Sequence, residues 1–576
     1  MLKKLAPSLK GYGIYAILTP VIIIGEVLME VLIPRVMGKI IDNGIMGTGG
    51  VDYVVKMGGL MVVMATFSLI CGALAGKFAS VASMGFAKGL RRNLFEKVQS
   101  FSFANIDKFS TSSLITRMTT DVINTQNTFM QLIRTMVRAP FMMIFATIMA
   151  IKINAKLSIV FAVAIPVLAI VLYVIIVKAF PKFQELFKKY DLMNRNVQEN
   201  LIAIRVVKAF VREDHENKKF SDSADAMRVS QIMAEKIVIL DTPIMQFVVY
   251  GCMLSVFWFG GKFIVQGSML TGDLISFISY IMQILMSLMM ISMVFVTFVM
   301  SKASLQRIIE VLDEVPDIND DNATDEQVKD GSIVFENVSF AYPSNKDNFA
   351  LERINLEIKS GETVGIIGGT GSSKTSLVQL IPRFYDTVKG KVLVGGRDVK
   401  EYKIETLRNS VSMVLQKNVL FSGTIKENLK WGDQNATDSE ITDACKSAQA
   451  DEFVRSFPNG YETDLGQGGV NVSGGQKQRL CIARALLKKP KIIILDDSTS
   501  AVDTATDEKI RSEFKKKLAD TTTIIIAQRI SSVKDADKIV VMNDGKIDGI
   551  GTHDELMQTN EIYREVYTSQ QKGADE

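Results

Sequence analysis

The 576-residue chain has few residues of the kinds that build disulfide or metal sites. Its four cysteines lie far apart, without the paired spacing of a zinc site or a disulfide framework, at Cys71, Cys252, Cys445 and Cys481. There are only two histidines, His215 and His553. The net charge of +4 is small for this length, so we expect no nucleic-acid-binding surface. Residues 1–7 lack the apolar core of a cleavable signal peptide, and we expect none.

Long apolar stretches are what the chain does have. Hydrophobic residues make up 48% of it and charged residues 22%, a mixture that suits a membrane-embedded part joined to a soluble part. The chain is also too long for one hydrophobic core, so we expect at least two domains. Six apolar stretches approach the roughly 20 residues that cross a bilayer. They are Gly13–Ile33, Met57–Phe78, Met136–Ile153, Leu157–Val177, Ile237–Phe259 and Leu274–Val299. Buried helices of a large soluble protein are the alternative, which six segments of this length make unattractive.

The flanking sequence predicts the orientation and the limits of the membrane part. Lys3, Lys4 and Lys10 indicate a cytoplasmic N-terminus, and an even number of crossings returns the chain to the cytoplasm. From Glu310 to Gly331 the sequence becomes acidic and polar, which we interpret as a solvated linker. We therefore predict a membrane domain over residues 1–309, a linker over 310–331 and a soluble domain over 332–576.

Proline is missing from residues 35–139 and from residues 182–242. In both gaps, helix-forming polar sequence continues well past the apolar part. One helix from Met57 to Ser100 would be roughly 65 Å long at about 1.5 Å per residue, whereas the bilayer core takes only about 30 Å. We therefore predict two long helical hairpins that project into the cytoplasm, with turns near Phe101–Thr111 and Val206–Glu213.

Two acidic residues interrupt the first apolar stretch. Glu26 and Glu30 lie one helical turn apart and should share a face of the helix. Two interpretations stay open: a polar patch on a substrate pathway, for example for cationic compounds, or a pair that hydrogen-bonds to neighbouring helices. Methionine and phenylalanine in the last span fit either an adaptable apolar cavity or ordinary helix packing. These residues are Met282, Met286, Met289, Met290, Met293, Phe295 and Phe298.

The soluble part alternates strands and helices, the pattern of a nucleotide-binding α/β domain. A short apolar strand, Thr363–Ile367, runs into a glycine-rich turn and then into a helix. Backbone N–H groups of such a turn converge on an anion. Lys374 would reach the β- and γ-phosphates, and the Thr375 hydroxyl would ligate Mg²⁺. A turn of this kind that binds nothing is the alternative at this point. The candidate phosphate-binding residues are Gly368, Gly369, Thr370, Gly371, Ser372, Ser373, Lys374, Thr375 and Ser376.

A second apolar run, Ile492–Leu495, has the composition of a buried strand and ends at Asp496 and Asp497. A carboxylate at the end of a strand beside a phosphate loop can hold Mg²⁺ directly or through water, and we assign that role to Asp496. Upstream, Val472–Arg479 forms a turn of small residues that opens a helix, which also suits phosphate binding.

Taken together, these motifs resemble the ATP-binding-cassette (ABC) exporter family, and the resemblance to its multidrug-type half-transporters covers nearly the whole chain. It implies six transmembrane helices with long cytoplasmic extensions, fused to an α/β P-loop domain that uses ATP and Mg²⁺, in a bacterial plasma membrane. It also implies that Tyr342 stacks on adenine and that Gln416, in the Q-loop, contacts the metal and the reacting groups. The implied signature residues are Ser473, Gly474, Gly475 and Gln476, and the implied D-loop is Ser500, Ala501, Val502 and Asp503. Segments Ile106–Arg117 and Glu199–Phe210 resemble the family's intracellular coupling regions.

Three departures from the family pattern concern ATP hydrolysis. Asp497 stands where the family has a glutamate that polarises the attacking water, and a carboxylate pulled back by about 1 Å can lower the rate about 10²-fold. Gln528 replaces the switch histidine and cannot carry a positive charge at neutral pH. Neither His215 nor His553 is placed in the sequence to substitute for it. Ser373 replaces a glycine and can perturb the fit to phosphate.

In the family, each ATP lies between the phosphate loop of one chain and the signature of the other. This chain combines a weakened catalytic half with an intact signature, so we predict a heterodimer with a second half-transporter subunit. The predicted function is an ATP-hydrolysing translocase subunit that moves small apolar or amphipathic compounds out of the cell by alternating access, without binding nucleic acid. The alternatives are a largely non-hydrolytic regulatory subunit that gates its partner, or a lipid or peptide translocator.

Overall fold

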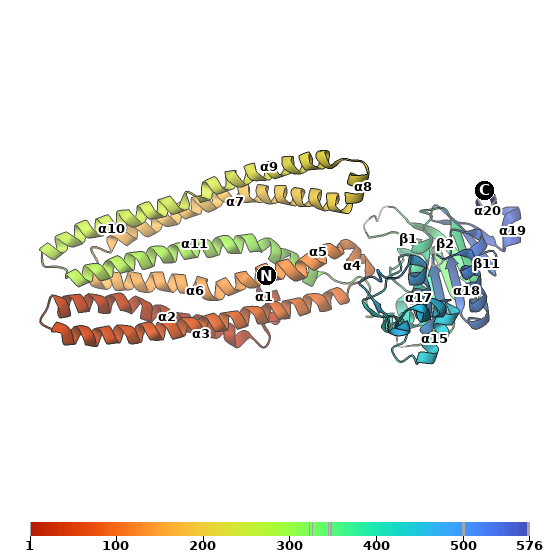
Figure 1. The fold of residues 1–576 in the computed structure, drawn as a ribbon, viewed down its shortest axis with the longest axis horizontal. Helices are drawn as coiled ribbons and strands as arrows, with labels where there is room; N and C mark the ends of the chain where they lie inside the picture. The colour runs from red at the N-terminus through yellow and green to blue at the C-terminus, as the bar shows by residue number, and fades with distance from the viewer. Residues whose placement is uncertain are drawn as a thin grey trace. The chain divides into compact units, whose positions relative to one another are not determined.

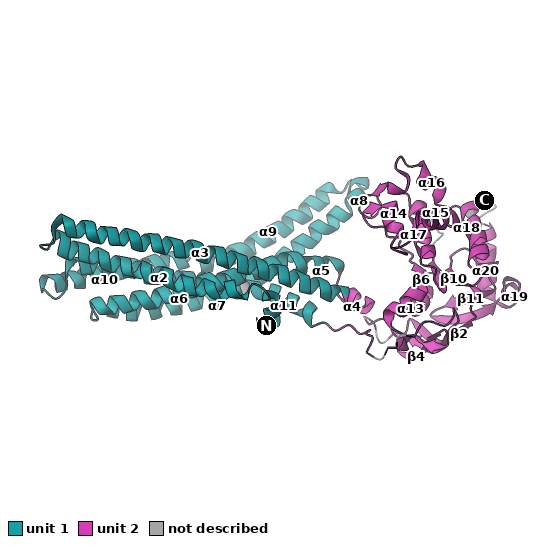
Figure 2. Cartoon of the chain, turned by 90° about the horizontal axis from the view of Figure 1, so that it is seen from below, with its two compact units in different colours: residues 1–99, 111–314 teal, residues 100–110, 315–576 magenta. Residues whose placement is uncertain are grey.

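The structure is a computed structural model that describes residues 2–321, 323–324, 326–343, 345, 348–497 and 502–572. It divides into two compact units, which Figure 2 shows in different colours. Unit 1 comprises residues 1–99 and 111–314, and unit 2 comprises residues 100–110 and 315–576. The short segment 100–110 therefore packs with the C-terminal part of the chain, although it lies between two helices of unit 1.

Unit 1 consists of long helices that run side by side (Figure 1). Within the described residues, six helical segments are long and apolar enough to cross a membrane, which confirms the six predicted spans. The helices are α1 (Leu2–Leu5), η1 (Ala6–Leu9), α2 (Gly13–Lys39), η2 (Ile40–Ile45), α3 (Gly50–Gln99), α5 (Thr111–Thr116), η3 (Arg117–Asp121), α6 (Val122–Ile153), α7 (Ile159–Ile202), α8 (Ile204–Ala209), α9 (Glu213–Val238), α10 (Asp241–Val265) and α11 (Thr271–Asp313).

The helices extend well beyond bilayer length, as the missing prolines predicted. Helix α3 has 50 residues, or about 75 Å at about 1.5 Å per residue. The two predicted turns are also confirmed. Short helices occupy both of them: α4 (Phe103–Lys108) follows α3, and α8 follows α7.

Polar contacts join α2 and α11 beside the proline inside α2. Pro34 has no N–H, so the carbonyl of Glu30, one turn earlier, loses its helical hydrogen bond. Gln283 Nε2 of α11 donates to that carbonyl at 3.5 Å, and such a contact from a neighbouring helix is what allows proline in a membrane span. Hydroxyl groups of α11 also donate to nearby carbonyls: Tyr280 Oη to Val31 O at 2.8 Å, and Ser276 Oγ to Pro34 O at 2.7 Å. At the same crossing Arg35 pairs with Asp273.

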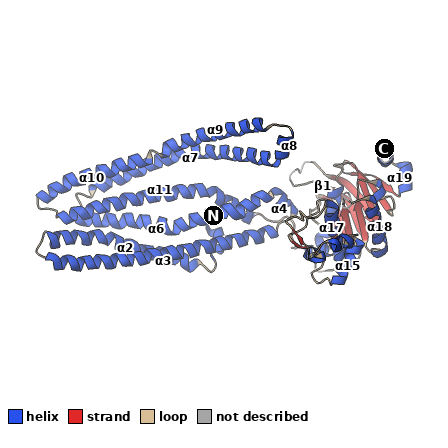
Figure 3. Cartoon of the chain, in the orientation of Figure 1, coloured by secondary structure: helices blue, strands red, loops and turns tan. Residues whose placement is uncertain are grey.

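Unit 2 contains a parallel sheet and an antiparallel sheet (Figure 3). The parallel sheet has the order β12-β11-β3-β10-β9-β6, with only β12 antiparallel to its neighbour. Its strands are β3 (Thr363–Gly368), β6 (Val411–Val414), β9 (Ile492–Asp496), β10 (Thr522–Ile526), β11 (Lys538–Asn543) and β12 (Lys546–Gly551). The predicted strands at residues 363–367 and 492–495 are thus confirmed, and β9 is buried along its whole length because the sheet is covered on both faces.

The remaining elements surround this sheet. The antiparallel sheet consists of β1 (Ile333–Phe340), β2 (Leu351–Ile358), β4 (Lys389–Val394) and β5 (Arg397–Asp398), and a small hairpin pairs β7 (Gly423–Thr424) with β8 (Asp464–Leu465). The helices are α12 (Lys374–Gln379), η4 (Val399–Glu401), α13 (Ile404–Ser410), α14 (Ile425–Leu429), α15 (Asp438–Ser447), α16 (Asp451–Ser456), η5 (Gly460–Glu462), α17 (Gly474–Leu487), α18 (Thr504–Lys517), η6 (Ile530–Ser532), α19 (His553–Thr559) and α20 (Glu561–Lys572).

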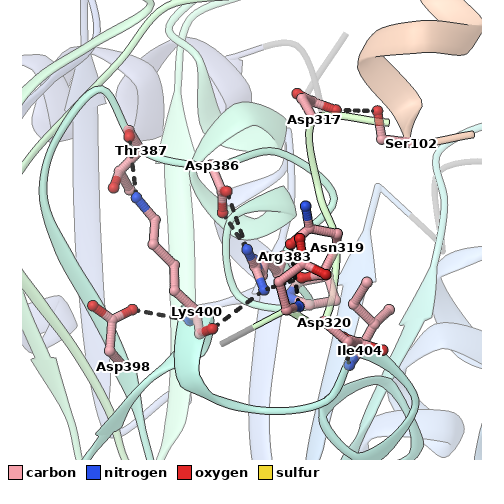
Figure 4. A network of polar contacts seen from close by, with 12 residues as sticks. Ser102, Asp317, Asn319, Asp320, Arg383, Asp386, Thr387, Asp398, Lys400 and Ile404 are labelled. Atoms are coloured by element: carbon pink, nitrogen blue, oxygen red, sulfur yellow. Dashed lines mark hydrogen bonds and ion pairs between the residues drawn. The ribbon is translucent and has the colours of Figure 1, made fainter. Parts of the chain in front are cut away.

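The stretch 310–331, which we expected to be a solvated linker, contains the last residues of α11 and then lies on unit 2. A polar network holds its first part (Figure 4). Asp320 Oδ1 accepts from the backbone N of Ile404 at 2.9 Å. The nearby Arg383 guanidinium donates to Asp386 Oδ1 at 2.9 Å and to the carbonyl of Asn319 at 3.4 Å. Acidic residues of this stretch therefore serve as hydrogen-bond acceptors for the unit that follows.

A glycine contact between α2 and α11 allows one test of the packing in unit 1. A Cβ at Gly272 would lie 2.1 Å from the carbonyl oxygen of Gly38, so Gly272→Ala must push two backbones apart. We expect it to lower the free energy of unfolding by about 1–3 kcal/mol. The measurement is the midpoint of heat-induced loss of the folded peak in size-exclusion chromatography of the purified chain.

Gly261→Ala is the matched control, because a Cβ at Gly261 in α10 meets nothing within 4 Å. Equal midpoints for the two variants would contradict the close approach of α2 and α11.

Candidate nucleotide-binding site

The glycine-rich turn lies at the carboxyl end of β3, in the interior of the parallel sheet. Strands β10 and β11 flank β3 on either side, and Val364, Ile366 and Ile367 anchor it in the core. The first residue of the turn must be glycine, because a Cβ at Gly368 would lie 2.2 Å from the carbonyl oxygen of Met542 on β11. The fold therefore presents this turn at the edge of the sheet where α/β proteins bind ligands.

Lys374 is bonded to the turn that precedes it. Its Nζ donates to Gly368 O at 2.9 Å, to Gly369 O at 2.8 Å and to Ser372 Oγ at 3.2 Å. Burial lowers the pKa of Lys374, while the carboxylates of Asp496 and Asp497 act in the opposite direction. The ammonium group thus has its three donors converging on the place where the sequence predicts phosphate oxygens.

Thr375 and Asp496 lie together, as expected for a magnesium site. Thr375 Oγ1 donates to Asp496 Oδ1 at 3.1 Å, across the interval between α12 and the end of β9. Asp496 is 1% exposed, and burial raises its pKa. Its other oxygen, Oδ2, is buried and has no hydrogen-bond partner in the described part of the chain. An unpartnered carboxylate oxygen beside a hydroxyl fits Mg²⁺, which takes oxygen ligands.

The structure does not bring Gln416 into this pair. Gln416 follows β6 in an exposed segment and makes no hydrogen bond to Thr375 or Asp496, all three of which are described residues. Its predicted contacts with metal and reacting groups stay a prediction.

Asp497 and Gln528, two of the three departures from the family pattern, are hydrogen-bonded to each other. Gln528 Nε2 donates to Asp497 Oδ2 at 2.9 Å. Asp497 has a φ of 48°, a left-handed conformation that aspartate tolerates better than most residues. Gln478 Nε2 donates to the carbonyl of Asp497 at 3.2 Å, and the N–H of Asp497 donates to Ile526 O at 3.0 Å. The backbone of Asp497 is therefore held from two sides while its carboxylate faces Gln528.

A residue that sequence reasoning missed holds the loop that carries Gln528. Gln570, on α20, donates from Nε2 to Gln528 O at 2.7 Å and accepts at Oε1 from the N–H of Ile530 at 2.9 Å. One side-chain amide thus bridges both sides of the loop. Nothing in the local sequence around Gln570 marks it, because its partners lie about forty positions earlier; the separation from Gln528 is 42 residues.

Tyr342 is half-buried in an aromatic cluster beside the phosphate loop. Its hydroxyl lies 2.8 Å from Ser376 Oγ, the residue that follows Thr375. Its ring packs edge-on against Tyr385 with a centroid separation of 5.3 Å. Tyr385 in turn donates a hydrogen bond to Asp107 Oδ2 at 2.6 Å, and burial together with that bond raises the pKa of Tyr385. Asp107 belongs to α4, so a continuous set of contacts joins this coupling segment to the phosphate loop within unit 2.

Stacking also fixes α4 on unit 2. The ring of Phe103 stacks on Phe384 with a centroid separation of 4.4 Å, and Asn105 Nδ2 donates to Val315 O at 3.3 Å. The predicted coupling segment 106–117 therefore contributes its first residues to unit 2 and the rest to unit 1.

The signature residues open α17. Ser473 is the N-cap of this helix: its Oγ accepts from Gln476 N, and the Gln476 side chain accepts from Ser473 N at 2.9 Å. This reciprocal cap leaves Ser473 and Gly474 exposed. Residues 473–476 and residues 368–376, all of them described, form no hydrogen bond with each other. The two motifs are thus separate surfaces of one chain.

Only part of the predicted D-loop lies within the residues that the structure describes. Ser500 and Ala501 lie outside the described residues. Asp503 is the N-cap of α18, where its Oδ1 accepts from Thr506 N at 2.9 Å, and this bond lowers the pKa of Asp503.

The two histidines of the chain, both of them described residues, do not hydrogen-bond to Gln528. His553 Nδ1 is 2.8 Å from the hydroxyl of Tyr563, and its ring also packs on Tyr567. His215 is an exposed residue of α9 in unit 1. Gln528 has no hydrogen bond to either of them.

Comparison with protein families matches both parts of the chain. Residues 16–288 match the ABC transporter transmembrane region, and residues 351–500 match the ABC transporter family. Among relatives, the ABC transporter ATP-binding protein YfiB of Bacillus subtilis is 38% identical over 99% of this chain and 98% of its own length. A putative multidrug export ATP-binding/permease protein of the same organism, YgaD, is 32% identical over 99% of both chains. An ATP-dependent lipid A-core flippase of Desulfotalea psychrophila is 32% identical over 84% of both chains.

A solved structure has the same fold. The structure of a bacterial Atm1-family ABC exporter with ATP bound matches with a TM-score of 0.84 and 24% sequence identity, over 98% of this chain and 98% of that one.

Ser373 provides a test of the phosphate loop itself. Its φ is 67°, the left-handed region, in which a side chain costs roughly 1 kcal/mol relative to glycine. We expect Ser373→Gly to raise the free energy of unfolding by about 1 kcal/mol, measured as the thermal midpoint of the purified chain without nucleotide.

Ser373→Ala separates backbone strain from loss of the hydroxyl, because alanine keeps the Cβ. It should give no gain, and an equal gain from both variants would show that the backbone conformation is not the cause.

Proposed function

The chain belongs to the ABC transporter family, as an exporter half-transporter with six membrane-spanning helices and a nucleotide-binding domain, and from this premise we propose that it is the catalytically weaker subunit of a heterodimer. The pair would be an ATP-driven exporter of apolar or amphipathic compounds. One observation carries the proposal: the Asp497 carboxylate and the Gln528 amide, which stand where the family has its glutamate and histidine, are hydrogen-bonded to each other at 2.9 Å.

That hydrogen bond matters for catalysis because Asp497 and Gln528 are poor substitutes for the family's glutamate and histidine. An aspartate carboxylate reaches about 1 Å less far than a glutamate, and an error of this size in placing a reacting group can lower a rate about 10²-fold. An amide can donate a hydrogen bond, but it cannot carry the charge of an imidazolium. With Gln528 holding Asp497, the carboxylate is also directed to a protein partner. These properties favour slow hydrolysis at this site.

The binding half of the site has the groups it needs. Lys374 would exchange its hydrogen bonds to Gly368, Gly369 and Ser372 for phosphate oxygens of ATP. Thr375 and Asp496 would hold Mg²⁺, and the unpartnered Oδ2 of Asp496 fits that role. When bound, the metal would neutralise charge on the β- and γ-phosphates. The chain would therefore retain ATP more readily than it splits it.

The separation of the two ATP-binding motifs supports pairing with another chain. The exposed signature at the start of α17 makes no hydrogen bond to the phosphate loop of its own chain, residues 368–376, all of which are described. In the family each nucleotide is enclosed by two chains, so this signature would complete the partner's site. A partner with the usual glutamate and histidine would then turn over ATP there.

Transmission to the membrane part would use the contacts of α4. Enclosure of ATP favours the closed pair of nucleotide-binding domains, so binding shifts the population of states. The contacts from Ser376 through Tyr342 and Tyr385 to Asp107 give α4 a direct connection to the phosphate loop. Because such coupling is reciprocal, a transported compound should change ATP affinity or turnover.

The class of cargo rests on two relatives. One is named as a putative multidrug exporter and the other as a lipid A-core flippase. A lipid translocator is therefore the second candidate within the same mechanism.

Restoring the two catalytic positions tests the proposal. Asp497→Glu with Gln528→His should raise the ATPase rate of the chain purified alone by about 10²-fold, while either single change gives much less. The measurement is phosphate release at saturating ATP.

Lys374→Ala added to the double variant is the control, since it should remove the gained activity with ATP binding. A double variant that is no faster than the unchanged chain, but binds ATP equally, would argue against a weakened site as the reason for pairing.

A further inference from the structure

A charged cavity lies among the helices of unit 1. Its volume is about 220 Å³, and residues of α2, α6 and α11 line it. The polar lining consists of Glu30, Arg138, Gln283 and Ser287, whose hydroxyl donates to the carbonyl of Ile284. Four methionines form much of the apolar lining: Met142, Met282, Met286 and Met290. None of these residues takes part in the nucleotide-binding site.

Arg138 is shared between the two acidic residues of α2. Its Nη1 lies 3.0 Å from Glu26 Oε1 and its Nη2 lies 2.7 Å from Glu30 Oε2. Gly72 on α3 makes room for this pair, because a Cβ there would lie 3.3 Å from the Glu26 carboxylate. The second interpretation of Glu26 and Glu30, a pair bonded to neighbouring helices, is therefore confirmed. It leaves the first interpretation open, because one guanidinium balances only one of two carboxylates.

The surplus charge faces the cavity. The Glu26 side chain is 12% exposed and Glu30 is 35% exposed, so Glu30 is the carboxylate that a ligand can reach. Arg134, one turn before Arg138 on α6, is exposed but does not line the cavity. Charged residues inside a membrane are costly and commonly belong to a substrate or ion pathway.

The side-chain amide of Gln283 contacts α2 through its nitrogen and leaves its oxygen without a hydrogen-bond donor among the described residues. Pro34 has no N–H to give to the carbonyl of Glu30, one turn before it. Gln283 Nε2 donates to that carbonyl at 3.5 Å, which directs the amide nitrogen to α2. The amide oxygen, Oε1, is buried and has no hydrogen-bond partner among the residues that the structure describes. A buried acceptor of this kind is costly to leave unpaired, so the cavity suits a ligand that brings an N–H or O–H donor.

The residues that line the cavity lie well inside helical segments that are long and apolar enough to cross a membrane. Glu30 and Arg138 are each 15 residues from the ends of the helical segments Gly13–Ile45 and Thr111–Ile153, and Gln283 is 12 residues from the start of α11. At about 1.5 Å per residue these separations correspond to roughly 18–22 Å, within a hydrocarbon core of about 30 Å.

We propose that this cavity binds the head group of a lipophilic monocation that carries at least one N–H donor, such as a protonated alkylamine. The ammonium group would pair with Glu30 and donate to Gln283 Oε1 once the amide turns toward the cavity. The alkyl chain would lie along the methionines, whose flexible side chains adapt to different shapes. As a description of cargo, this inference rests on the proposed export function, but binding itself does not.

The test compares four compounds of one chain length for binding to the purified full chain in lipid nanodiscs without nucleotide: decylamine, decyltrimethylammonium, decanol and decanoate. Equilibrium dialysis gives the affinities. We expect decylamine to bind most tightly, and Glu30→Gln to weaken it at least about tenfold because a partly desolvated ion pair is lost. Gln283→Met should weaken decylamine about fivefold and leave decyltrimethylammonium, which has no N–H, unchanged.

Glu96→Gln, which changes an exposed carboxylate on α3 paired with Arg92, is the matched control and should bind decylamine normally. Equal binding of decylamine and decanol, or tighter binding of decanoate, would overturn the proposal. Because the assay contains no ATP, a failure of the heterodimer proposal leaves its result unaffected. Conversely, export of neutral compounds without decylamine binding would overturn this inference alone.

Discussion

The end of strand β9 is the constraint on which the ATP site depends. β9 is buried on both faces and pairs in parallel with β10 and β6, so its last residue cannot shift along the sheet. That rigidity places Asp496 against Thr375 and turns the next residue, Asp497, into a left-handed conformation that faces Gln528. The proposed roles in metal binding and water activation thus fall on two consecutive residues, the last residue of β9 and the one that follows it. A change of one methylene at the second residue leaves the first untouched, which is how a site can lose turnover and keep affinity.

Contacts of the nucleotide-binding unit extend from this strand end in two directions. Gln570 holds the Gln528 loop from α20, and Gln478 holds the backbone of Asp497 from α17, the helix that the signature opens. On the other side of the phosphate loop, Tyr342 and Tyr385 lead to Asp107 of α4. Within unit 2, hydrogen bonds and ring contacts therefore link the end of β9 to α17 and α20, and the phosphate loop to α4.

Much of this architecture could be predicted because its signals are local. Apolar runs of bilayer length, two long intervals without proline, a glycine-rich turn after a strand and an apolar strand that ends in two aspartates each lie within one short stretch of sequence. The helical spans, the two turns occupied by α4 and α8, and the strands at 363–368 and 492–496 all followed from such stretches.

The features that could not be predicted depend on contacts between distant residues. Gln528 and Asp497 are 31 positions apart, and Arg138 and Glu30 are 108 apart. For Arg138 a signal did exist: an arginine at the edge of an apolar stretch needs a carboxylate, and Glu26 and Glu30 were the acidic residues in a neighbouring span. For Gln570 there was none, since a glutamine on an amphipathic terminal helix has no distinguishing pattern. The hydrogen bond that Asp320 accepts from the backbone of Ile404 was likewise not predicted, because its donor lies 84 positions away.

Asymmetry between binding and splitting ATP is the central claim, and a single-turnover experiment on the chain purified alone measures both. With a small excess of protein over radiolabelled ATP, filter retention gives the bound nucleotide and chromatography of the retained fraction gives its ADP content. The account predicts that ATP is retained and remains mostly unhydrolysed over many minutes. Rapid conversion of the retained nucleotide to ADP, abolished by Lys374→Ala, would contradict it.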